Sequence, residues 1–190
     1  MIRWLLLFVG GALLGGIVHL ATIIIMPRTA TQDAFSRLAR IAPANTMTVL
    51  SAPTHESAPM PFMDPAFASA ICRYDLSQGT LKLTVPVSLA YTSVSFYTRY
   101  DVAYYAINDR AAGRRVIELE LMTVEQRNQL PEDEDITAAD RLIVESPTLT
   151  GLIAIRALAP EPGLLQMAQN TIAAAQCKRQ DEPNTQSQRN

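Results

Sequence analysis

Residues 71–122 carry the strongest structural pattern in the chain and read ICRYDLSQGTLKLTVPVSLAYTSVSFYTRYDVAYYAINDRAAGRRVIELELM. Apolar and polar residues alternate in short segments, which turn residues separate. The clearest segments are LKLTV at 81–85 and IELEL at 117–121. Such alternation is typical of a strand with one buried and one wet face. The stretch predicts a meander of strands, with Glu118 and Glu120 facing solvent.

Further strands are expected on both sides of this stretch. Residues 46–50 and 141–145 have strand-like composition. Residues 151–158 are apolar on nearly both faces, which indicates a central strand of a sheet. The fold class predicted is therefore α+β, with a small, sandwich-like antiparallel β domain.

Helices are expected where the sequence offers capping residues or helical periodicity. Asp64 followed by Pro65 predicts a helix start, with the helix ending near Ala70. Thr123 predicts the cap of a second short helix. Residues 164–175 have an apolar face at helical spacing and predict a C-terminal amphipathic helix that covers the sheet.

An uncharged apolar run at residues 4–26 follows Arg3. At about 1.5 Å per residue, a helix of about 23 residues crosses a hydrocarbon core of about 30 Å. A cleavable signal would have a shorter apolar region and a small-residue cleavage site. We predict an uncleaved transmembrane anchor at residues 1–27, a β-rich domain at 28–177 and a disordered polar tail at 178–190.

Two features of the anchor bear on its orientation and partners. A short basic tail followed by an apolar run is typical of a signal-anchor, which favours a domain on the outer side. The arginines after the run favour the opposite orientation. Gly11 and Gly15 form a small-xxx-small pair, and His19 continues that face toward a possible helix partner. His19 is either a protonatable intramembrane group or an interhelical hydrogen-bonding group.

Composition excludes several functional classes. The net charge is −2, and no basic stripe with interleaved aromatic residues occurs, so we expect no nucleic-acid partner. His55 is the one histidine outside the apolar run, so a hydrolase triad has a single candidate base and a metal site at His55 lacks partners. The acidic run at 132–135 lacks the spacing of a calcium loop. We assign no catalytic residue, metal or cofactor, and favour a non-enzymatic role.

The richest chemistry lies in residues 91–110, where tyrosine and serine are frequent. These residues could line a ligand groove, with polar contacts from Tyr97, Asp101, Tyr105, Asp109 and Arg110. Alternatively, the tyrosines cap a sheet edge with their rings packed and their hydroxyls in water. Both interpretations remain open from the sequence.

The chain has two cysteines, Cys72 and Cys177. They form a disulfide if the domain is exported, and remain thiols if it is not. A bridge would pin the C-terminal helix onto the sheet.

Four segments read together carry a family resemblance: CRYDL at 72–76, YTSVSFY at 91–97, YAINDR at 105–110 and IVESP at 143–147. The chain resembles the bacterial DUF1254 family in a short, membrane-anchored form. Longer members join a DUF1254 part to a DUF1214 part, both rich in β structure, and their function is largely unassigned. They carry an Asn-containing segment where this chain has residues 61–65, and we transfer no functional residue.

The apolar run, the missing catalytic set and the resemblance together predict a single-pass protein of the bacterial inner membrane with a periplasmic domain. On this interpretation it is an interaction or accessory module of the cell envelope, and its partner is a β-rich, DUF1214-like companion. The alternative is a small-molecule binding or hydrolytic domain that uses the tyrosine-rich strands.

Overall fold

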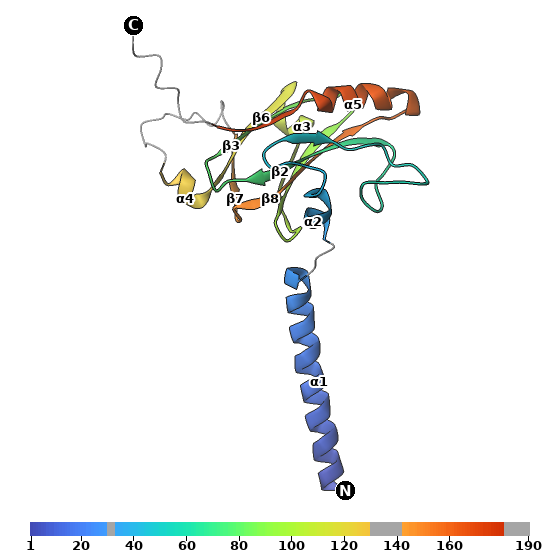
Figure 1. Ribbon diagram of the computed structural model, residues 1–190, viewed down its shortest axis with the longest axis vertical. Coiled ribbons are helices and arrows are strands. Elements are labelled where there is room, and N and C mark those ends of the chain that lie inside the picture. Colours follow the sequence, from blue (N-terminus) through green and yellow to red (C-terminus); the bar gives the residue numbers. More distant parts are fainter. Residues whose placement is uncertain (30–32, 130–141, 181–190) are drawn as a thin grey trace. The chain divides into compact units, whose positions relative to one another are not determined.

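The computed structural model describes residues 1–29, 33–129 and 142–180, and Figure 1 shows their helices and strands. The chain divides into two compact units, Met1–Asp33 and Ala34–Asn190. The expected acidic loop at 132–135 and the tail from residue 181 onward lie outside the described residues.

The first unit contains the helix α1 (Ile2–Thr29). Its segment Ile2–Met26 is long and apolar enough to cross a membrane, with a mean hydropathy of 2.2, and none of it is buried within the protein. A signal sequence meets the same criterion of length and composition. The apolar N-terminal helix expected from the sequence is thus confirmed.

The second unit is built on two sheets. The first sheet has the order β1 (Met47–Val49), β2 (Phe67–Asp75), β8 (Thr150–Leu158), β4 (Thr92–Thr98) and β5 (Ala103–Asn108). The second has the order β7 (Leu142–Ser146), β6 (Val116–Thr123), β3 (Leu81–Pro86) and β9 (Gln176–Arg179). Buried side chains from both sheets share one core. The α+β class and the β-rich domain are confirmed.

The strand order differs from the predicted meander. Among the strands of residues 71–122, β4 pairs with β5 and β3 pairs with β6, whereas β2 pairs with β1 and β8. β6 and β7 are parallel, so the second sheet is mixed. The alternation of residues indicates which face of each strand is apolar. It does not indicate which strands pair, because consecutive strands of a sandwich can belong to opposite sheets and still face the same core.

Burial along the strands follows the predicted alternation, with one exception. Leu81, Leu83 and Val85 are buried in β3, while Lys82 between them is exposed. Glu120 is 8% exposed, so the prediction that its side chain faces solvent was wrong. The Thr80 hydroxyl donates a hydrogen bond to the Glu120 carboxylate at 2.8 Å, which offsets part of the cost of burying that charge.

The prediction of a helix that starts at Asp64 was also wrong. Asp64 does accept a hydrogen bond from the Ala66 N–H, at 2.9 Å, but the chain turns there and enters β2 at Phe67. All nine residues of β2 pair with β8. The pairing with a central strand overrides the local preference for a helix.

The described part of the unit also contains short helical segments: α2 (Ala34–Leu38), α3 (Asp109–Ala112), α4 (Val124–Arg127), the 3₁₀ turn η1 (Pro162–Leu164) and α5 (Leu165–Ala173). Thr123 caps α4 as predicted, in a capping box with Gln126. The predicted C-terminal helix corresponds to α5, drawn in red in Figure 1, which packs against β1, β2 and β8 of the first sheet and against β3 of the second. Its buried side chains Ala168 and Ile172 belong to the main core.

The structure joins Cys72 to Cys177 in a disulfide whose Cα atoms are 6.4 Å apart. Cys177 lies in β9, not at the end of α5, and β9 pairs with β3. The bridge therefore links the two sheets through the core, and it does not pin the helix as expected. Lys178 and Arg179, assigned from the sequence to the tail, are also part of β9.

Asn45 attaches the segment before β1 to the end of β2. Its side-chain oxygen accepts from the Asp75 N–H at 2.8 Å, and its side-chain nitrogen donates to the Asp75 carbonyl at 2.9 Å. Asn45 has φ 54°, in the left-handed region that asparagine tolerates better than most residues. The side chain thus replaces one rung of a strand ladder.

Candidate functional site

A cavity of about 340 Å³ opens on the face of the first sheet that points away from the second sheet. Strands β2, β8 and β4 form its floor, and α2 and the loop at residues 60–64 form its walls. Its lining residues are Ala34, Leu38, Leu50, Met60, Pro61, Phe62, Met63, Asp64, Phe67, Ser69, Ala70, Ile71, Tyr97, Asp101, Leu152, Ala154, Ile155 and Arg156. A volume of this size and a mainly apolar lining are typical of small-molecule sites.

The strand register explains why the floor is hollow. Ala154 of β8 lies between Ile71 of β2 and Ser95 of β4. The next outward-facing pair along β2 and β8 is Ser69 with Arg156. Small side chains at the middle of the floor leave space, because side chains stand roughly perpendicular to the sheet.

A second apolar cluster holds the α2 wall in place. Its buried members are Phe35, Leu38, Ala42, Leu50, Ile71 and Leu152. The guanidinium carbon of Arg99 lies 4.3 Å from the centre of the Phe35 ring, and that of Arg73 lies 6.0 Å from it. These cation–π contacts add to the apolar burial that fixes α2 on the sheet.

Two carboxylates and one guanidinium lie among the lining residues. Asp101 is in the turn between β4 and β5, with φ 59°, and accepts a hydrogen bond from the Ala34 N–H at 3.1 Å. Asp64 accepts from the Ala66 N–H. Arg156 is exposed and is the one cation among the described residues that line the cavity.

Phe62 marks the rim of the cavity. Its side chain is fully exposed at 104%, and its backbone has φ 58°. A positive φ is rare and costly for a bulky residue without a special backbone role. The exposed Phe62 ring lies beside the apolar lining of the cavity.

A family model described as "Protein of unknown function (DUF1254)" matches residues 44–179. The chain belongs to the DUF1254 family. The matched region runs from the Asn45 segment to β9 and so includes both sheets and the disulfide. The family resemblance read from the sequence is confirmed. Comparison with curated proteins gave no match.

Two solved structures resemble this DUF1254 chain. The VPA0106 protein of Vibrio parahaemolyticus is 12% identical with a TM-score of 0.56, and the likeness covers 76% of this chain but 32% of that one. An uncharacterised protein of Burkholderia cenocepacia is 18% identical with a TM-score of 0.44, over 82% of this chain and 46% of that one. The first likeness shows the fold. The DUF1254 chain thus spans less than half the length of each of these two proteins.

The five ligand contacts proposed from the sequence do not form one site. Tyr97 and Asp101 line the cavity. Tyr105 packs toward the core, with its ring 5.8 Å from that of Phe96. Asp109 begins α3 and accepts from the Thr92 N–H at 3.4 Å, and Arg110 is exposed on the same short helix.

A buried polar cluster, made of Tyr74, Tyr104, Ser146 and Thr148, lies at one end of β7 and β8. The Tyr74 hydroxyl lies 3.0 Å from the Ser146 hydroxyl and accepts from the Tyr104 hydroxyl at 3.3 Å. Burial raises the pKa of the Tyr104 hydroxyl well above its usual value, so Tyr104 stays protonated and donates. Among the described residues no buried side-chain polar atom lacks a partner. The cluster is fully hydrogen-bonded and serves the structure.

Asp75 is the other described residue whose pKa is shifted. Hydrogen bonds from Ser77 lower the pKa of its carboxyl, and Arg73 and Arg179 act in the same direction. Asp75 therefore remains ionised, which does not suit a general acid near neutral pH.

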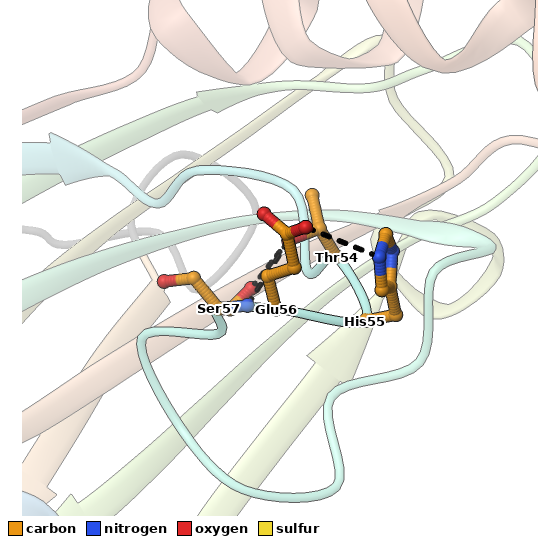
Figure 2. A network of polar contacts seen from close by, with 4 residues as sticks. All are labelled: Thr54, His55, Glu56 and Ser57. Atoms are coloured by element: carbon orange, nitrogen blue, oxygen red, sulfur yellow. Dashed lines mark hydrogen bonds and ion pairs between the residues drawn. The ribbon is translucent and has the colours of Figure 1, made fainter.

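His55 lies on a surface loop whose polar contacts are local (Figure 2). Thr54 and Ser57 close the loop through a backbone hydrogen bond of 2.8 Å and two side-chain bonds of 3.1 Å. The imidazole lies 3.4 Å from the carboxylate of the adjacent Glu56, and both side chains are more than 80% exposed. The described residues contain no group of three or more His, Cys, Asp or Glu that could hold a metal ion.

The glycine face of α1 is uncovered in this chain. A Cβ added at Gly11 or Gly15 would have no other atom within 4 Å, apart from the helix's own backbone. The packing role of Gly11, Gly15 and His19 remains a prediction.

Proposed function

We propose that this DUF1254 chain is a membrane-tethered module of the bacterial cell envelope that acts by associating with a β-rich, DUF1214-type companion. The observation that carries the proposal is the likeness to the Vibrio protein, in which the shared fold takes up 32% of the chain. In that protein the domain is covalently joined to further sequence. We propose that the companion of the present domain is a separate chain.

The apolar helix α1 supports the membrane location. Its 25-residue segment Ile2–Met26 has the length and composition of a single span. The Cys72–Cys177 disulfide suits an oxidising compartment, which favours a domain on the periplasmic side of the inner membrane.

A second, smaller hollow of about 170 Å³ offers the companion an apolar contact. It lies between α5 and the loop before β4, and its lining includes Leu89, Leu164 and Met167. Leu89 is 91% exposed and Met167 50% exposed. Exposed apolar side chains grouped around a hollow are typical of interaction sites.

Cross-linking in native membranes followed by mild-detergent purification of the tagged full-length protein tests the association. Mass spectrometry should find a DUF1214-type chain in amounts comparable to the bait. The double variant Leu89→Glu/Met167→Glu should lose it, because two carboxylates would be desolvated at the contact. Leu149→Glu, at an exposed leucine on the turn between β7 and β8, is the matched control. Recovery of a lone, well-folded protein after cross-linking would overturn the proposal.

A second candidate function is small-molecule binding or hydrolysis by the tyrosine-rich strands. The cavity favours small-molecule binding over hydrolysis, because Tyr97 and Asp101 both line the cavity. Tyr97→Phe should weaken any ligand that the cavity binds, while Tyr105→Phe, on the core side of β5, should not. Equal effects of the two substitutions on ligand binding would contradict a site at Tyr97.

A further inference from the structure

The mainly apolar lining of the cavity favours an apolar ligand. Arg156 and Leu152 both point to the outer face of β8, with Ala154 between them. Four strand residues extend over about 13 Å. We call the hollow at Ala154 the trough; it lies between the Leu152 and Arg156 side chains, beside apolar residues of α2 and of the loop at 60–64.

Arg156 marks where an anionic group can bind, because it is the one cation among the described residues that line the cavity. The Asp101 and Asp64 carboxylates already accept backbone N–H groups, of Ala34 and Ala66. Arg156 supplies the cationic hydrogen-bond donors, and its guanidinium suits a carboxylate or a phosphate. Asp101 lies near the opposite end, next to the end of β4, where it disfavours a second anion.

The covalent chain places the cavity within reach of the membrane that the proposed function requires. Ala34, a lining residue, follows Met26, the last residue of the apolar segment, by eight positions. Eight residues extend over at most about 29 Å. The exposed Phe62 ring adds an apolar contact at the rim.

We propose that this cavity binds a single-chain anionic amphiphile drawn from the membrane, with the acyl chain along β8 and the carboxylate or phosphate at Arg156. The inference rests on the membrane tether of the proposed function and is independent of the companion. A fatty acid and a lysophospholipid share the required chemistry.

Photo-cross-linking of the full-length protein in phosphatidylcholine nanodiscs tests the site. Two probes carry a diazirine in the acyl chain, one a fatty acid and the other a lysophosphatidic acid. Peptide mapping should find labels at residues 60–71 and 150–158, and the probe with the higher yield identifies the source of the ligand. Labels found in α1 alone would overturn the proposal.

Two variants separate the acyl contact from the head-group contact. Ala154→Leu fills the trough and should abolish labelling of the second unit, whereas Ala173→Leu, exposed on α5, should not change it. Arg156→Gln should reduce labelling about tenfold, as expected for one charge-assisted hydrogen bond. Arg115→Gln, exposed before β6, should leave it unchanged. Circular dichroism verifies that each variant is folded.

A trimethylammonium amphiphile with the same chain tests the sign of the charge. It should label the second unit weakly, and labelling equal to that of the fatty acid would contradict the role of Arg156. Failure of the membrane tether is recognised separately, because the protein would then not co-purify with nanodiscs at all.

Discussion

Gly151 is a residue whose identity the fold requires. A Cβ at this position would overlap the Tyr97 carbonyl oxygen and the Tyr74 hydroxyl. Because one of these atoms belongs to the backbone of β4, neither strand can yield easily. We predict that Gly151→Ala lowers the free energy of unfolding by about 3 kcal/mol, at the upper end of overpacking effects.

Urea unfolding of the detergent-solubilised protein, followed by circular dichroism, measures this loss. Gly163→Ala is the control, since no atom lies within 4 Å of its added Cβ and its φ is not positive. Equal stability of the two variants would show that β4 and β8 are not as close as the structure has them.

Asn45 combines two hydrogen bonds with a left-handed backbone. Asn45→Ala removes both bonds to Asp75 and strains the φ of 54°, so we expect a loss of about 3 kcal/mol. Asn45→Gly removes the same bonds without the strain and should cost about 1 kcal/mol less. The same unfolding measurement applies, and identical losses would contradict a contribution from the backbone conformation.

Among the elements, the connection between β2 and β9 has the largest predicted effect on stability. The disulfide joins positions 105 residues apart. In the chain-entropy model, closing a loop of about 100 residues contributes about 4–5 kcal/mol. We expect the double variant Cys72→Ala/Cys177→Ala to lose about this amount.

Gel mobility measures the bridge directly in protein taken from native membranes. The oxidised protein should migrate faster without reductant than with it, and the double variant should migrate equally in both conditions. Equal mobility of the wild-type protein would contradict the bridge.

Elements whose burial follows from their own residues could be predicted from the sequence. Adjacent residues alone predict the alternation in β3, the two apolar faces of β8 and the cap at Thr123. The pairing of β2 with β8 and the burial of Glu120 depend on strands distant in sequence, and neither local pattern encodes them. Asp64 shows the same limit, because its capping chemistry is used in a turn that leads into a strand.

The cavity was predictable only in part, for the same reason. Tyr97 and Asp101 belong to the tyrosine-rich segment that the sequence singled out. Ala154, α2 and the loop at 60–64 reach the site through packing between distant segments, and small floor residues carry no recognisable motif.

At the scale of the whole molecule, the proposed function requires a membrane anchor and a disulfide-linked β-rich domain on the outer side. The proposed companion and the oxidised state of the cysteines both depend on this orientation. The arginines that follow the apolar run favour the opposite orientation, because positive residues favour the inner side.

Protease accessibility in spheroplasts tests this central claim most directly. With a tag at the C-terminus, added protease should remove the tagged domain from intact spheroplasts while a cytoplasmic marker protein survives. A domain that stays protected until the cells are lysed would contradict the outer location, and with it the proposed function in the envelope.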